Sequence, residues 1–244
     1  MKRTGSREPV SNAGLVVGIG LGLLLVALSL PRVVASASVA VVSGDVRMAF
    51  KSGATLSEPK LTQAIDHYAL ALSWQPQSGM LRHGYASLLM QQKNFKERKE
   101  PEFRSAADRI ESELMSAARA APGRPLIWAD LARVESYWAL PSGDYENMLR
   151  LSSLLGPYEV SNVIRRLEVM APIWTELPDD LQAVTRRDAR MLWEFPVLRR
   201  YLVSIYLAQN FQGRTMIRTL AFSDSREVRR FDRYLVERLR RKNS

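Results

Sequence analysis

The stretch that decides the fold is Ala13–Leu30, AGLVVGIGLGLLLVALSL. It contains eighteen residues and no charge, and an α-helix needs about 20 apolar residues to cross a hydrocarbon core about 30 Å thick. Its seven Leu, three Val and one Ile together favour insertion by about 3 to 7 kcal/mol. We therefore predict a transmembrane helix over residues 13–31, after a short basic tail at 1–12.

Two interpretations of this stretch stay open. It is either a retained anchor or a secretory signal that is cleaved at the A-x-A sequence Ala35–Ala37. Signal cores run about 7–15 residues, so the length favours the anchor. Both interpretations place the following residues outside the cytoplasm.

The charges beside the span predict its orientation. Lys2, Arg3 and Arg7 precede it, whereas the twenty residues that follow contain Arg32 and Arg47. Because positive flanks stay in the cytoplasm, we expect a single-pass protein of the bacterial inner membrane with its soluble domain on the periplasmic side.

Three glycines within the span are spaced four residues apart. Gly14, Gly18 and Gly22 would share one helical face, where small residues let two helices pack closely. This spacing would allow copies of the chain to associate through their membrane helices, although glycine is also common in membrane helices generally.

Composition argues against several kinds of chemistry. The chain lacks Cys and has two His, His67 and His83, whereas a metal site needs three or more converging ligands. Neither a phosphate-binding glycine loop nor a nucleophile motif occurs in the soluble part. We therefore expect a protein that is not an enzyme and that binds no metal or cofactor.

Charge is concentrated in the last quarter of the chain. The net charge is +10. Residues 186–244 carry 15 Lys or Arg against 6 Asp or Glu, whereas residues 1–185 carry 20 against 19. Such asymmetry suggests an anionic partner surface.

The residues after the span follow a helical period. We expect a juxtamembrane connector at 32–60, a helical domain at 61–222 and a basic C-terminal helix at 223–244. Apolar residues recur at three and four positions, and Pro and Gly separate the segments. The helices predicted before the last one cover 61–75, 79–92, 105–121, 125–138, 145–155, 161–174, 181–195 and 197–210.

One segment resembles a tetratricopeptide repeat. Ala64, Tyr68, Ala71 and Pro76 match the small, aromatic, small and proline positions of the second helix of that family. Ala117 with Pro122 fits the same helix again, and Trp128, Leu131 and Ala132 fit the first helix. In the segment that follows Pro76, Ala86 is the one residue that matches the first helix of the family well.

The match covers about residues 61–156 and is degenerate. Pro76 and Pro122 are 46 residues apart and Pro122 and Pro157 are 35 apart, whereas the family repeats every 34 or so. The resemblance implies an all-α fold of antiparallel hairpins in a tetratricopeptide-like right-handed solenoid, behind the N-terminal span.

The resemblance also implies a ligand-facing surface. In the family the first helix of each pair lines the concave face, which would place Asp130, Arg133 and Tyr137 toward a partner. An ordinary solvated helix face is the alternative. Tyr85 is a further candidate, because a glycan-binding groove would expose aromatic rings there.

The C-terminal helix is the strongest candidate for an anionic contact. Asp224 and Glu227 resemble a capping box at its start. Its cations include Arg229, Arg230, Arg233, Arg240 and Arg241. They could meet anionic lipid, an acidic protein or an anionic glycan, or the helix could only cap the domain. The expected location at the membrane makes nucleic acid an unlikely partner.

These patterns together predict a membrane-anchored, non-enzymatic scaffold that binds another protein of the bacterial cell envelope. The alternative is an accessory subunit of a machine for polysaccharide polymerisation, ligation or export, binding an anionic glycan or its enzyme. Helix-pair domains behind an N-terminal anchor resemble such accessory proteins at the level of the fold.

Overall fold

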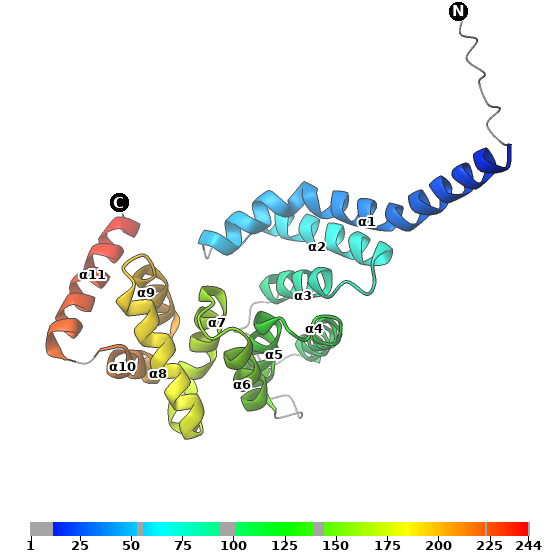
Figure 1. Cartoon of the computed structure of the whole chain (residues 1–244). Coiled ribbons are helices and arrows are strands. Elements are labelled where there is room, and N and C mark those ends of the chain that lie inside the picture. The colour runs from blue at the N-terminus through cyan, green and yellow to red at the C-terminus, as the bar shows by residue number, and fades with distance from the viewer. Residues whose placement is uncertain (1–11, 53–55, 93–100, 139–143, 223, 244) are drawn as a thin grey trace, which may run out of the picture. The chain divides into compact units, whose positions relative to one another are not determined.

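The computed structural model describes residues 12–52, 56–92, 101–138, 144–222 and 224–243. Every regular element among them is a helix, as predicted, and the first is long and apolar enough to span a membrane. The chain divides into two compact units, 1–92 and 93–244. Figure 1 shows the whole chain.

The first unit is built on one long helix. Helix α1 (Asn12–Ser52) is followed by α2 (Glu58–Trp74) and α3 (Gly79–Gln92), and α2 packs against both. Pro31 lies inside α1, and Figure 1 shows α1 bending between its dark-blue and lighter-blue parts. A proline removes one backbone hydrogen bond and kinks a helix, which accounts for the bend.

The two halves of α1 have different surroundings. Residues 16–30 are exposed on all sides, but beyond Pro31 one face becomes buried. This face recurs at helical spacing and packs against α2. Its buried members are Ala35, Ser38, Val42 and Val46.

This arrangement differs from the connector expected at 32–60. Residues 32–52 continue α1, because their stripe of small and apolar side chains packs against apolar side chains of α2. Residues 61–92 accordingly pack with α1 in the first unit, instead of opening a domain that runs to residue 222.

Helices α2 and α3 approach each other closely at Gly84. A Cβ atom at Gly84 would lie 2.3 Å from Cε1 of Tyr68. The ring of Tyr68 therefore occupies the space that a side chain on α3 would need. Burial also raises the pKa of the Tyr68 phenol, because an apolar environment disfavours the charged form.

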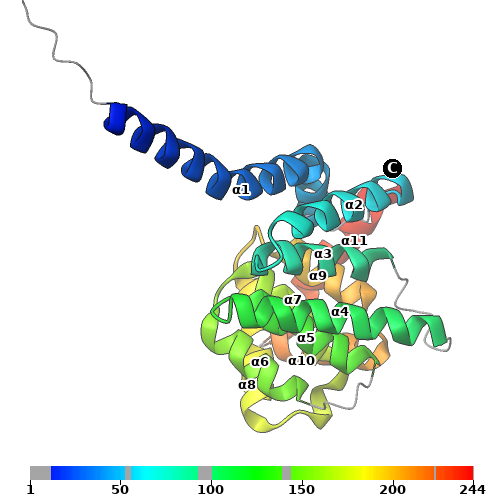
Figure 2. The same ribbon diagram turned by 90° about the vertical axis from the view of Figure 1, so that its right-hand side faces the viewer.

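The second unit begins with four helices, of which the first two are longer than the other two. They are α4 (Pro101–Ala120), α5 (Pro125–Trp138), α6 (Tyr145–Leu155) and α7 (Val160–Met170). A 3₁₀ turn, η1 (Ala171–Glu176), then leads to α8 (Asp179–Glu194). Figure 2 shows α4 lying alongside α5, which is its packing partner.

Three helices complete the unit: α9 (Arg199–Ala208), α10 (Phe211–Ala221) and α11 (Ser225–Asn243). From α5 to α8, each helix packs against the next and the next but one. This is the neighbour pattern of helical repeats.

The structure adds to the predicted helices in two places. Helix α10 lies between the helices predicted at 197–210 and 223–244. Helix α8 begins at Asp179, two residues before the predicted start, and no side chain caps it. Asp180 instead pairs with Arg150 of α6, with 2.7 Å between Oδ2 and Nε, and this hydrogen bond lowers the pKa of the Asp180 carboxyl.

The core of the second unit's last helices is aromatic. Phe231 of α11 is fully buried and meets the rings of Trp193, Tyr206 and Phe222, with centroids 4.9 to 5.8 Å apart. Such contacts add about 0.5–1.5 kcal/mol per pair beyond their buried area. They attach α11 to α8 and α9.

Candidate functional site

The surface predicted on α5 is covered in part by α7. Asp130 is 1% exposed, and its Oδ1 lies 2.7 Å from Nε of Arg165 on α7. Arg165 also pairs with Glu168 at 2.7 Å. The exposure expected for Asp130 is therefore wrong, because the packing of α7 against α5 encloses this carboxylate in an ion pair.

The other predicted partner residues are scattered. Arg133 is half-buried on α5. Tyr85 belongs to α3 in the first unit and is 5% exposed, so it cannot present its ring to a glycan. Tyr137 lies in α5, but its side chain lies outside the described residues. Trp128 is half-buried, and its Nε1 donates to the carbonyl of Pro122 at 2.8 Å.

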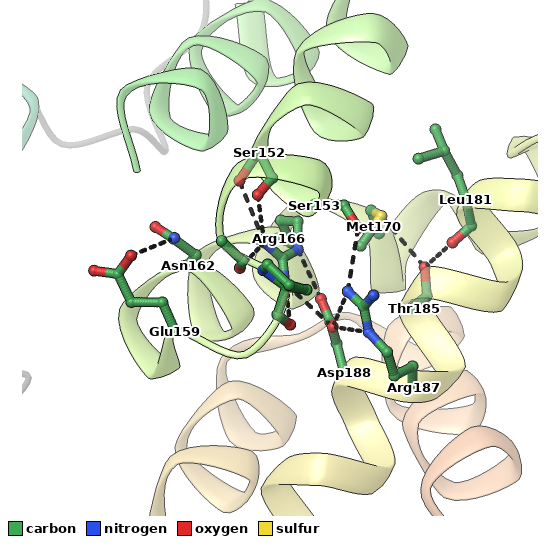
Figure 3. Close-up of polar contacts among 12 residues, drawn as sticks. Ser152, Ser153, Glu159, Asn162, Arg166, Met170, Leu181, Thr185, Arg187 and Asp188 are labelled. Atoms are coloured by element: carbon green, nitrogen blue, oxygen red, sulfur yellow. Dashed lines mark hydrogen bonds and ion pairs between the residues drawn. The ribbon is translucent and has the colours of Figure 1, made fainter. Parts of the chain in front are cut away.

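A buried polar cluster in the second unit was not predicted. Arg166 of α7 and Asp188 of α8 are both fully buried, and two hydrogen bonds of 2.8 and 3.2 Å join the guanidinium to the carboxylate (Figure 3). The same guanidinium donates to the carbonyls of Ser152, Gly156 and Pro157 at 3.1 to 3.3 Å.

This cluster organises the end of α6. The last carbonyls of a helix have no partner within the helix and carry partial negative charge, and Arg166 supplies both a donor and a positive charge. Gly156 is tightly enclosed, since a Cβ there would lie 2.4 Å from Nδ2 of Asn162. Complete enclosure leaves no room for a substrate, so the cluster serves packing.

One neighbour of the cluster reaches the surface. Arg187 is partly exposed and donates to Oδ1 of Asp188 at 2.9 Å and to Oγ of Ser153 at 3.2 Å (Figure 3). Among the described residues, no group of three or more His, Cys, Asp or Glu is arranged to hold a metal ion.

Helix α11 is the strongest candidate for binding. The carboxylate of Asp224 accepts from the backbone N–H groups of Arg226 and Glu227 at 2.7 and 2.9 Å. The predicted cap is thus confirmed for Asp224. Satisfying these N–H groups fixes where α11 begins.

Five of the cations of α11 share one face. At about 100° per residue, Arg226, Arg229, Arg230, Arg233 and Arg240 fall on the side opposite Phe231, and the structure leaves all five exposed. We call these five residues the arginine face. Glu237 also lies on it. Arg241 falls about 80° from Phe231 by spacing, and its side chain lies outside the described residues.

The buried stripe of α11 ends before the helix does. Val228 and Leu235 flank Phe231 against the core, whereas Val236 and Leu239 are 47% and 41% exposed. The second half of α11 therefore presents apolar and cationic side chains together to solvent.

Sequence reasoning missed one cation beside this face. The guanidinium of Arg199, at the start of α9, lies 4.6 Å from the ring centroid of Trp193, and its Nε donates to the Trp193 carbonyl at 2.8 Å. Burial and the nearby charge of Arg230 lower the pKa of Arg199. The signal in the sequence is the pair Arg199-Arg200 at the start of the helix predicted at 197–210.

Two of the three evenly spaced glycines of the span, Gly18 and Gly22, have open space around them. No atom outside the helix's own backbone lies within 4 Å of a Cβ built at Gly18 or Gly22. The surroundings of Gly14 lie outside the described residues. Self-association through this face stays a prediction.

Comparisons with protein-family models, with curated proteins and with solved structures found no match. Any function must therefore be argued from the helix α1, the packing of the second unit and the arginine face.

Proposed function

We propose that this protein is a membrane-anchored, non-enzymatic scaffold of the bacterial cell envelope that binds another protein. The observation that carries the proposal is α1. Its first half exposes an uninterrupted apolar surface, and its second half is part of the core of the first unit. Apolar side chains exposed on every face of a helix are costly in water and are expected in lipid.

The helical packing supports the binding role. Contacts between each helix and its next two neighbours suit a tetratricopeptide-like array, and such arrays use extended surfaces to bind partners. The arginine face of α11 supplies an electrostatic contact for an acidic partner surface. An anchor in the membrane raises the effective concentration of the module there.

The alternative, a glycan-binding accessory subunit, requires exposed aromatic rings. Tyr85 is buried and Trp128 is half-buried. These two positions weaken the glycan alternative, and the side chain of Tyr137 lies outside the described residues.

The absence of cysteine makes a direct topology test possible. Single substitutions Ser6→Cys and Asn243→Cys in the full chain each create one unique thiol. In intact spheroplasts, a membrane-impermeant maleimide should label position 243 at once and position 6 only after lysis. The membrane fraction should retain both variants through alkaline carbonate extraction.

Two outcomes would contradict the proposal. Release of the protein by carbonate, or a mature N-terminus near Ser38, would exclude a retained anchor. Labelling of position 6 but not 243 in intact cells would reverse the orientation and exclude a periplasmic scaffold.

A further inference from the structure

The turn between α2 and α3 lies beside the place where α1 changes from exposed to packed. Helices α1 and α2 are antiparallel, and Lys60 pairs with Asp45 at 2.9 Å. Trp74 lies fourteen residues after Lys60, and Pro31 lies fourteen residues before Asp45. Because both helices rise about 1.5 Å per residue, Trp74 is level with about Pro31, and Figure 1 shows this end of α2 beside the bend.

Apolar side chains are exposed around this turn. Leu70 and Trp74 share one face of α2 and are 49% and 42% exposed, and Met80 in the first turn of α3 is 61% exposed. Arg82 donates from Nε to the carbonyl of Pro76 at 2.8 Å, which places a guanidinium at the same end of the unit. Arg32 of α1 is exposed as well.

This combination matches the interface of a bilayer. Tryptophan prefers the headgroup level, where its ring is buried and its N–H stays hydrated. Arginine pairs with phosphate through two parallel hydrogen bonds.

The dimensions agree with this placement. The headgroup regions extend a bilayer from about 30 Å to about 40–45 Å, which leaves roughly 5–8 Å on each side. Leu30, the last residue of the apolar run, and Ala35, the first buried residue of α1, are five residues apart, or about 7.5 Å. The first unit therefore begins within the thickness of one headgroup layer.

We propose that the α2–α3 turn is a second membrane contact, in which Leu70, Trp74 and Met80 enter the headgroup layer of the bilayer that α1 spans. The inference rests on the proposed function, because it takes the exposed half of α1 as the span. The helix is continuous through residues 31–35, so no loop separates this end of the unit from the lipid.

Three single-cysteine variants of the full chain test the contact. Leu21→Cys reports on the span, Gln77→Cys on the turn and Thr62→Cys on the other end of α2; all three positions are exposed. Thr62 lies twelve residues from Trp74, or about 18 Å along the helix. Each thiol is labelled with an environment-sensitive dye, and the protein is reconstituted in phosphatidylcholine and phosphatidylglycerol vesicles that contain spin-labelled lipid.

We expect lipid spin-labelled at the headgroup to quench the dye at 77 at least about threefold more than the dye at 62. Lipid spin-labelled deep in the acyl chain should quench the dye at 21. Equal quenching at 77 and 62, with position 21 quenched, would overturn the second contact alone. Absence of quenching at 21 would overturn the anchor as well. Circular dichroism of the three variants checks that the helices are retained.

Discussion

The guanidinium of Arg166 joins α6, α7 and α8 from a position without solvent contact. Taking a charge out of water costs several kcal/mol, and the charge is stable only if its hydrogen bonds are complete. Here Nε and both terminal nitrogens have acceptors, and Asp188 balances the charge.

Replacing Arg166 by Met should lower the free energy of unfolding by about 3–5 kcal/mol, because Asp188 then loses its buried partner and keeps only the partly exposed Arg187. The double variant Arg166→Met with Asp188→Leu should recover most of that loss, since no buried charge remains. Urea unfolding of the full chain in detergent, followed by circular dichroism, measures both.

Arg187→Met provides the control. Arg187 also contacts Asp188 but is partly exposed, so its loss should cost about 1 kcal/mol or less. Equal losses for the two single variants would contradict the argument that burial of the Arg166 charge sets the cost.

At the scale of the helix, α11 combines a buried stripe with an exposed arginine face. Reversing three of its charges, in Arg229→Glu, Arg233→Glu and Arg240→Glu together, should weaken binding of a fluorescent polyglutamate peptide about tenfold or more at low salt, because each exposed pair contributes about 0.5–1 kcal/mol. Fluorescence anisotropy at two ionic strengths measures this effect and its screening.

The matched control carries the same charge change elsewhere on the second unit. Three other exposed arginines are replaced by Glu in it, namely Arg119, Arg124 and Arg190. If both triple variants lose binding equally, the peptide responds to net charge, and the arginine face has no special role.

The helices were predictable where apolar spacing and breakers coincide. Pro125, Gly156 and Pro157 bound helices at the expected places. Helix α10 escaped prediction because Gly213 and the polar residues of its first turns weaken the helical signal, and its fold depends on Ile217 and Leu220 meeting the core. Tertiary packing overrides such local preferences.

The site was less predictable than the helices. The cationic side of α11 follows from its periodicity. The burial of Asp130 and the pairing of Arg166 with Asp188 depend on which helix covers which, across 35 and 22 residues of sequence. A single sequence without a strong repeat does not supply that information.

At the scale of the whole molecule, α1 belongs both to the candidate span and to the first unit. A chain that starts at Arg32 keeps the face that covers Leu61 and Ala64, whereas one that starts at Ser57 exposes them. Because burying one Val is worth about 1.5–3 kcal/mol, we expect the longer chain to protect α2 and α3 from proteolysis. The shorter chain should be cut there at least about tenfold faster.

Mass spectrometry of the fragments identifies the cleavage sites. Cleavage within the second unit should proceed at the same rate in both chains, since no residue is removed from it. Equal protection of α2 and α3 in the two chains would show that α1 is dispensable for the first unit.

The packing of each helix from α5 to α8 against its next two neighbours also bears on how the chain acquires its structure. Such contacts close short loops, and short loops cost little chain entropy. Domains dominated by such local contacts fold in about microseconds to milliseconds. Helices α5 to α7 can therefore find these partners soon after they leave the ribosome or the translocation channel. The aromatic core of α8 and α9 is complete only once Phe231 of α11 has emerged.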